Sequence, residues 1–249
     1  YLLSLSDVKE AKAMYQTIHT LPLYDKANKF YQTSEPLDAW TNEIGRIRAF
    51  TPGWLERESN FLHMTYKYML GLLKAGLYDE FFSEIKTNLT CFMDPKIYGR
   101  SPLENSSFIA TSSNPDPKKR GQGFYARLSG STAEILSMWR FMFLGKHPFV
   151  YQDGKLRFQL EPVLPKEMFV DGVVESTLFG SIKIVLHNEG TVDTYAEGVR
   201  VGKYSVQSLS QQAQVIVGHC IEGPLAHAIR NGQVSEIHAY IEGGSKPND

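Results

Sequence analysis

A short polar string in the middle of the chain has the chemistry of an anion site. The residues Ser129-Gly130-Ser131-Thr132 lead into an apolar helical pattern, and Arg127 precedes them. Free N–H groups at a helix start carry a partial positive charge, and neighbouring hydroxyls can donate further hydrogen bonds, so the string suits a phosphate. The structural alternative is a capping box formed by Ser131 and Glu134, which leaves Arg127 and the start of the string without a role.

A second polar group lies beside the most apolar helical stretch of the sequence. Glu56, Arg57 and Glu58 come just before this stretch, and His63 falls one turn inside it. Titratable groups in such a position are candidates for chemistry. In the structural alternative, the acids complement the helix dipole and His63 forms a hydrogen bond inside the core. From the residues alone, the structural alternative is favoured.

A third polar group belongs to a long stretch, residues 91–130, that has almost no helical or strand periodicity. Loops of this length usually serve function. The segment from Tyr98 through Arg100 to Ser107 includes Glu104 and Asn105, whose carboxylate and amide could bind sugar hydroxyls. Tyr98 and Phe108 could then stack on a sugar ring. The alternative, given equal weight, is an ordered loop whose Asn and Ser side chains satisfy its own backbone.

Composition excludes several classes of function. The chain has 249 residues and a net charge of -1, so no overall field attracts nucleic acid or an anionic membrane. Its two cysteines form neither a metal spacing nor a disulfide framework, which indicates a reducing compartment. No run of 18 apolar residues is present. We therefore expect a cytoplasmic protein with no metal and no cofactor.

The apolar period predicts helices in the first part of the chain and strands in the second. Helices are predicted from a cap at Ser6 to about Thr20, over 60–77 with Gly76 near the stop, on through Leu89, and over 131–144. Alternation then predicts strands around 156–160, 182–186, 191–201, 204–209, 214–217 and 235–241, with a helical turn over 224–230. A helical block followed by a strand block indicates an α+β fold. We place the domains at 1–147 and 148–249.

Four strings carry a resemblance to a known family. The chain resembles the C-terminal part of the bacterial β-oligoglucan phosphorylases. These enzymes act on β-1,3- or β-1,2-glucans and are relatives of cellobiose phosphorylase. The similar strings are residues 48–58 (RAFTPGWLERE), 61–68 (FLHMTYKY), 98–109 (YGRSPLENSSFI) and 126–134 (ARLSGSTAE). The resemblance covers about residues 45–165, with a weaker echo beyond. It implies the last helices of an (α/α)6 toroid, followed by a C-terminal antiparallel β-rich, sandwich-like domain.

The resemblance also implies roles for individual residues. The family's phosphate contacts match His63, Ser129 and Gly130, with Ser131 close by, and Arg127 would add positive charge. Sugar contacts would come from the polar segments described above, at Glu56, Tyr98, Arg100, Glu104 and Asn105. The Gly-Gly that follows the family's sugar-binding Glu is absent here, which leaves Glu56 and Glu58 as alternatives. The family's general-acid Asp lies upstream of the matched strings, so no catalytic residue is expected in this chain.

The implied activity is inverting phosphorolysis of β-glucan oligosaccharides, with inorganic phosphate as co-substrate and α-glucose 1-phosphate as product. The expected partners are the oligosaccharide, phosphate and the remainder of the polypeptide N-terminal to this chain, with a homodimer as a possible assembly. Two other classes stay open: a non-catalytic carbohydrate-binding or scaffold module, and an inverting glycoside hydrolase of similar fold. We call the expected phosphate contacts, His63, Arg127 and the Ser129-Gly130-Ser131 turn, the phosphate cradle. If they bind one phosphate, His63 and the turn should lie close together in space, with Glu104 near them.

Overall fold

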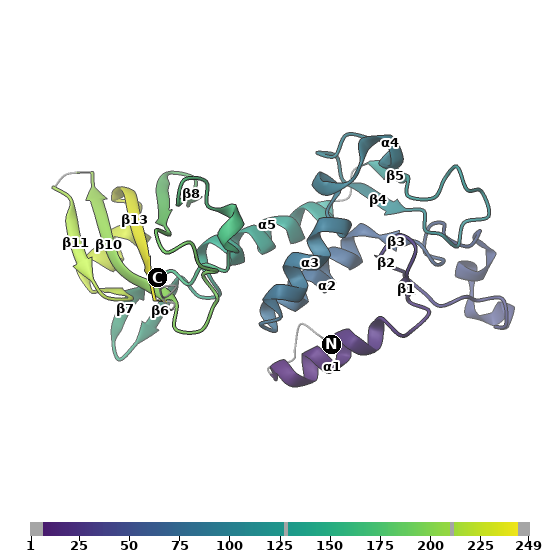
Figure 1. Cartoon of the computed structure of the whole chain (residues 1–249), viewed down its shortest axis with the longest axis horizontal. Coiled ribbons are helices and arrows are strands. Elements are labelled where there is room, and N and C mark those ends of the chain that lie inside the picture. The colour runs from purple at the N-terminus through teal and green to yellow at the C-terminus, as the bar shows by residue number, and fades with distance from the viewer. Residues whose placement is uncertain (1–6, 127–128, 210–211, 244–249) are drawn as a thin grey trace, which may run out of the picture. The chain divides into compact units, whose positions relative to one another are not determined.

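The computed structural model describes residues 7–126, 129–209 and 212–243. Within them the chain forms six α-helices and mainly antiparallel sheets, which confirms the α+β class (Figure 1). The chain divides into two compact units, residues 1–138 and 139–249, which are described separately below. The expected domain boundary near residue 147 lies just beyond helix α5 (Ser129–Leu144), whereas the division between the units falls within that helix.

Unit 1 is built around two neighbouring helices, α2 (Leu62–Lys74) and α3 (Tyr78–Asn88) (Figure 1). The large apolar side chains of α2 recur at helical spacing, so they lie on one face of the helix. That face is buried in the core of unit 1. Gly76 ends the helix in a left-handed conformation, with φ of 79°, and the Leu77 N–H donates to the Leu72 carbonyl at 2.9 Å. The predicted helix and its stop are therefore confirmed.

The other elements of unit 1 are short. They are α1 (Val8–Ile18), β1 (Tyr24–Asp25), β2 (Phe30–Tyr31), η2 (Asn42–Ile44), η3 (Arg46–Ala49), β3 (Asn60–Phe61), η4 (Thr90–Phe92), α4 (Pro95–Tyr98), β4 (Ser106–Ile109) and β5 (Gly123–Ala126). The cap of α1 is Asp7, whose carboxylate accepts from the Lys9 and Glu10 amides, and the helix ends at Ile18 rather than near Thr20.

The stretch 91–130 contains more regular structure than its sequence predicts. Strands β3, β4 and β5 form a three-stranded antiparallel sheet, and Phe108 on β4 pairs with both Phe61 and Phe124. None of the three strands shows alternation of apolar and polar residues in the sequence. Trp54 packs against the same cluster, with its ring centroid 5.0 Å from that of Phe108 and 4.3 Å from that of Phe124. The small sheet is held by aromatic packing as much as by its hydrogen bonds.

The irregular segment before β3 depends on a buried arginine. Arg57 is 6% exposed, and its guanidinium donates to the backbone carbonyls of Arg48 and Phe50 at 2.9 and 3.2 Å. It also donates to the carboxylates of Asp38 and Glu58 at 2.7 and 3.2 Å. Glu58 is itself 3% exposed, so its charge is compensated by Arg57 inside the protein.

A buried carboxylate ties the β1–β2 turn to the loop that follows β4. Asp25 accepts hydrogen bonds from the Ala27 and Asn28 amides and from the Asn28 side chain. It also accepts from the Ser112 amide and hydroxyl at 2.9 and 2.6 Å. Burial alone would raise the pKa of Asp25, but the donors from Ser112 and Asn28 outweigh it and hold that pKa below its usual value.

The described residues of unit 2 form two sheets, the short helix α6 and the end of α5. The five-stranded sheet has the order β11-β10-β13-β9-β8, with β13 and β9 parallel and the other neighbours antiparallel, and the three-stranded sheet has the order β12-β7-β6. The elements are β6 (Phe149–Gln152), β7 (Lys155–Phe158), η5 (Lys166–Met168), β8 (Val173–Leu178), β9 (Ile182–His187), β10 (Arg200–Ser208), β11 (Gln214–Val217), β12 (Ile221–Glu222), α6 (Pro224–Arg230) and β13 (Val234–Glu242).

Most strand predictions in unit 2 are confirmed, and so is the helical turn over 224–230. The strand predicted over 191–201 is wrong, because that segment forms turns and β10 begins at Arg200. Asn188 donates to the Val192 carbonyl at 2.7 Å, and Thr191 has a positive φ of 48°. Side-chain hydrogen bonds of this kind favour a turn over a strand. No described helix is long and apolar enough to cross a membrane.

Replacing Arg57 should destabilise the chain strongly. In Arg57→Met the Glu58 carboxylate loses its compensating charge while buried, and we expect a loss of about 3–5 kcal/mol in the free energy of unfolding. Urea unfolding followed by tryptophan fluorescence measures it. The control is Arg46→Met, since Arg46 is exposed and pairs with Glu56 at the surface, where about 0–1 kcal/mol is expected. Adding Glu58→Gln to Arg57→Met should recover part of the loss, and no recovery would contradict the pairing.

Asp25 should make stability depend on pH in the acid range. Because its folded pKa is depressed, its contribution is fully present above the unfolded pKa and is lost as pH falls through the folded pKa. Asp25→Asn should cost about 1.5–3 kcal/mol at neutral pH and flatten the fall of stability below about pH 4. Urea unfolding at a series of pH values tests this. Asp153→Asn, at an exposed turn, is the control, and an equal change in both variants would contradict the role of Asp25.

Candidate functional site

The structure brings two of the predicted phosphate contacts together. His63 lies on the first turn of α2 and Gly130 is the second residue of α5. A Cβ added to Gly130 would lie 2.7 Å from Cδ2, 2.9 Å from Cγ and 2.9 Å from Nε2 of His63. The imidazole therefore packs directly against Gly130. The predicted approach of His63 to this turn is confirmed at Gly130, while the anion-binding role of both residues stays a prediction.

The ring of His63 is half-buried and has no hydrogen-bond partner among the described residues. Neither ring nitrogen forms a hydrogen bond or an ion pair with residues 7–126, 129–209 or 212–243. The expected structural alternative for His63, a hydrogen bond inside the core, is therefore absent from the described residues. A ring held by packing, with neither nitrogen bonded to a described residue, can bind a ligand from either nitrogen.

The start of α5 differs from the capping box that the sequence suggests. The helix begins at Ser129, two residues before the predicted start, so Ser131 lies inside its first turn and is buried. Ser131 has an interaction of its own and is not a free donor for a ligand. Arg127 lies outside the described residues, and so does the side chain of Ser129. The described part of the predicted cradle is thus the His63 ring and the backbone at the helix start.

Tyr98 organises the loop from within. It is 1% exposed, and its hydroxyl donates to the Glu104 carbonyl at 2.7 Å and lies 2.9 Å from both the amide and the hydroxyl of Ser106. Burial raises the pKa of this phenol. The expectation that Tyr98 and Phe108 stack on a sugar ring is wrong for this structure, because both rings are buried in the protein.

Arg100 and Asn105 also fix the loop. Arg100 donates to the Gly123 carbonyl at 2.7 Å and to the Glu104 carboxylate at 2.9 Å. The amide oxygen of Asn105 accepts from the Tyr66 hydroxyl on α2 at 3.0 Å. Of the predicted sugar contacts in this loop, Glu104 is the most open, since its side chain is 40% exposed. A ligand could reach its carboxylate while Arg100 holds it in place.

The structure separates the two glutamates that the sequence leaves as alternatives. Glu58 is buried, carries a positive φ of 57° and pairs with Arg57. Glu56 has a side chain that is 38% exposed and pairs with Arg46 at 2.9 Å. One of its carboxylate oxygens, Oε2, is enclosed and accepts no hydrogen bond from the part of the chain that the structure describes. Glu56 is therefore the residue of the two that a ligand could reach, and Glu58 has a structural role.

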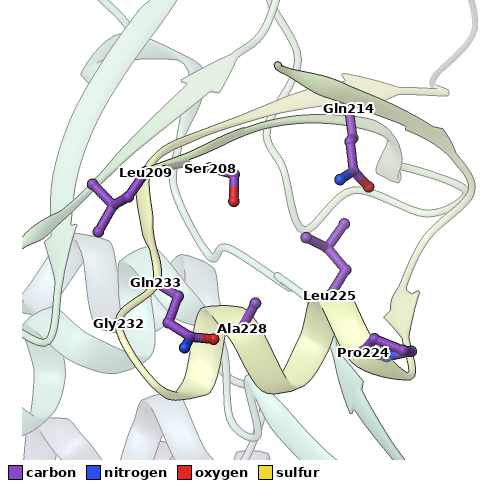
Figure 2. Close-up of a pocket in the computed structure, with 8 residues that line it drawn as sticks. All are labelled: Ser208, Leu209, Gln214, Pro224, Leu225, Ala228, Gly232 and Gln233. Atoms are coloured by element: carbon purple, nitrogen blue, oxygen red, sulfur yellow. The ribbon is translucent and has the colours of Figure 1, made fainter. Parts of the chain in front are cut away.

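Among the described residues, two of the pockets are lined by other residues. One, of about 230 Å³, lies at the start of α2 and is lined by the neighbours of His63 in sequence, Phe61, Met64 and Thr65, together with Ile18, Leu23, Tyr31, Gln32, Thr33 and Tyr68. The other, of about 480 Å³, lies in unit 2 between α6 and the ends of β10 and β11. Figure 2 shows Gln214 and Leu225 facing one another across it, and its lining carries no charged side chain. Neither pocket contains a predicted site residue.

Unit 1 has a polar cluster that was not predicted from the sequence, formed by Tyr15, His19, Tyr31 and Glu84. The Tyr15 hydroxyl donates to the Glu84 carboxylate at 2.8 Å, and His19 Nε2 lies 3.3 Å from the same oxygen. The Tyr31 hydroxyl lies 3.2 Å from His19 Nε2. Burial, and then the hydrogen bond to Glu84, raise the pKa of Tyr15. The i, i+4 spacing of Tyr15 and His19 is the feature of the sequence that could have predicted this cluster. The cluster joins α1 to α3.

The comparisons with known proteins add no family. The sequence matches no family model, and no curated protein matches it. Among the described residues, no group of three or more His, Cys, Asp or Glu side chains could hold a metal ion.

The contact between His63 and Gly130 can be tested by a double-mutant cycle. Gly130→Ala should cost about 1–3 kcal/mol of stability, because the new methyl group overlaps the imidazole. In a His63→Ala background the same change should instead gain up to about 1 kcal/mol, because Ala is the better helix former. Thermal or urea unfolding measures both. Gly190→Ala, which meets only a Val192 methyl at 4.0 Å, is the control, and equal effects of Gly130→Ala in both backgrounds would exclude the contact.

Proposed function

We propose that this chain is part of an inverting glycoside phosphorylase. The enzyme cleaves β-glucan oligosaccharides with inorganic phosphate and releases α-glucose 1-phosphate and a shortened oligosaccharide. The observation that carries the proposal is the packing of the His63 ring against Gly130 at the start of α5. This contact puts an imidazole beside the N–H donors of a helix start. The resemblance of the four sequence strings to β-oligoglucan phosphorylases supports the same assignment.

The chemistry of phosphorolysis explains why such a pair is useful. In an inverting phosphorylase, phosphate attacks the anomeric carbon where a hydrolase would use water. One carboxylic acid then suffices to protonate the leaving oxygen, and the general base is replaced by groups that bind the anion. An imidazole and the N–H groups of a helix start lower the repulsion between a phosphate dianion and nearby carboxylates.

The exposed carboxylates supply the other half of the site. Glu104 and Glu56 are the predicted sugar contacts that a ligand could reach, and each is oriented by an arginine at 2.9 Å. Carboxylates held in this way accept hydrogen bonds from sugar hydroxyls. We assign them to the oligosaccharide, with Tyr98, Arg100 and Asn105 as residues that position the loop. By the resemblance, the general acid comes from polypeptide N-terminal to this chain.

We assign α2, α3 and α5 to the last helices of an (α/α)6 toroid, and unit 2 to a C-terminal sandwich-like domain. The contact between the neighbouring helices α2 and α3 supports this assignment. A carbohydrate-binding or scaffold module would not need the imidazole at the helix start. A hydrolase would need a second carboxylate directed at water.

Phosphate-dependent turnover is the test. The full-length polypeptide that contains this chain should form glucose 1-phosphate from β-1,3- or β-1,2-gluco-oligosaccharides only when phosphate is present, and residues 1–249 alone should show no turnover. Release of glucose without phosphate would instead indicate a hydrolase. Sugar binding with no turnover by the full-length protein would indicate a binding module.

His63→Ala should impair phosphate use selectively. In the full-length enzyme we expect a phosphate KM raised, or a kcat lowered, by about 10- to 100-fold, which is about 1.4–2.7 kcal/mol of transition-state binding. The oligosaccharide KM should change little. The matched control is His147→Ala, because His147 is exposed after α5. Equal losses for phosphate and oligosaccharide would contradict the assignment of His63.

A further inference from the structure

The five-stranded sheet of unit 2 contains one parallel seam. In the strand order β11-β10-β13-β9-β8, the β8–β9 hairpin joins the other described strands of the sheet where β9 lies beside β13. Parallel pairs are slightly less stable per residue than antiparallel pairs. Side-chain contacts across the β9–β13 seam therefore help to decide how firmly the hairpin is held in the sheet.

Two histidines form such a contact. In the parallel register His238 pairs with Val185 and Tyr240 pairs with His187, so the two imidazoles are diagonal neighbours on one face of the sheet. His187 Nε2 lies 2.8 Å from His238 Nδ1, whereas the ring centroids are 5.1 Å apart. The two nitrogens therefore point at one another in a hydrogen bond, in which one nitrogen donates its proton and the other accepts it.

We propose that this histidine pair is a proton-operated latch, which holds the β9–β13 seam while His187 is neutral and loosens it when both rings are charged. A neutral imidazole has one N–H group and one nitrogen that accepts, whereas an imidazolium has two N–H groups. The pair can take up one extra proton and keep its hydrogen bond, because a charged ring still donates to a neutral one. A second extra proton puts two N–H groups of charged rings 2.8 Å apart, and the hydrogen bond is lost.

The groups around the pair favour a neutral His187. Glu236 Oε1 lies 3.5 Å from His238 Nε2, so a proton on that nitrogen has a carboxylate to donate to. Burial, followed by the neighbouring His238, lowers the pKa of His187. Lys203 lowers this pKa further, and Glu189 opposes the shift without cancelling it. The first extra proton therefore belongs on the β13 ring and the second on the β9 ring.

The other charged groups on this face of the sheet are paired. Lys203 Nζ lies 4.0 Å from the ring centroid of Tyr240, and this ring stacks on the β9 imidazole at 4.5 Å. Lys183 Nζ lies 2.6 Å from Glu175 and 3.7 Å from Glu236. Histidine is the side chain whose ordinary charge change falls between about pH 5 and 8, so acidification in this range acts on the histidine pair. None of these residues has a part in the proposed phosphorolysis.

The direction of the pH dependence follows from the lowered pKa of His187. In the unfolded chain an ordinary imidazole has a pKa of about 6.5. Because the folded pKa of His187 lies below the unfolded value, its contribution to stability is fully present above the unfolded pKa. That contribution is lost as pH falls toward the folded pKa. Acid should therefore loosen the β9–β13 seam and leave the antiparallel β10–β11 pair unaffected.

Hydrogen exchange of the 249-residue chain at about pH 7.5 and at about pH 5 tests the latch. After correction for the intrinsic exchange rate, the protection of the backbone amides that join β9 to β13 should fall about 5- to 10-fold at the lower pH, as expected for the loss of one hydrogen bond. In His187→Gln this fall should be absent, because glutamine can donate and accept hydrogen bonds without titrating.

The matched control is His227→Gln, because His227 lies exposed on α6. It should show the same fall in protection as the unaltered chain. The proposal is overturned if His187→Gln keeps the full fall in protection, or if His227→Gln abolishes it.

A second measurement does not depend on any variant folding. Nitrogen NMR of the imidazoles in the unaltered chain follows the hydrogen bond between His187 and His238 during acidification. The hydrogen bond should be present at neutral pH and should disappear as His187 takes up its own proton. A hydrogen bond that persists once both rings are charged, or a His187 ring that is already charged at neutral pH, overturns the latch.

Discussion

The guanidinium of Arg57 is the constraint on which unit 1 depends. Residues between β2 and β3 form little regular structure, so their backbone carbonyls need partners from elsewhere. Arg57 supplies two of them, at Arg48 and Phe50, and compensates Glu58 in the same buried place. The Glu58 carbonyl in turn accepts from Thr111, beyond β4. This one charged group therefore fixes the approach to β3 and α2, and with it the position of His63.

The sequence predicted the long, strongly periodic elements well. The helices α2 and α3, the stop at Gly76 and the turn of helix ended by Asn231 and Gly232 follow from apolar spacing and from turn residues. The strands β4 and β5 were not predicted, because their sequences, SSFI and GFYA, show no alternation of apolar and polar residues. The strand expected over 191–201 failed because the Asn188 side chain offers the backbone a turn instead.

The candidate site was predicted in part. The meeting of His63 with Gly130 followed from two groups that each lacked a complete local role, and the structure places them in contact. The prediction for Tyr98 failed because a tyrosine among Gly, Arg and Ser residues is expected to be exposed. In the structure its hydroxyl forms hydrogen bonds with the backbone of the same loop. The choice between Glu56 and Glu58 required burial and pairing, which depend on residues distant in sequence.

The order of strands in unit 2 has a consequence for synthesis of the chain. β8 pairs with β9 and β10 pairs with β11, but the two pairs do not meet until β13 enters between β9 and β10. A two-stranded sheet is marginally stable by itself. On the ribosome, residues 173–217 would therefore wait as two open hairpins, each with an exposed edge that can pair with another chain. The opportunity for misassembly ends only when residues 234–242 emerge and occupy both edges.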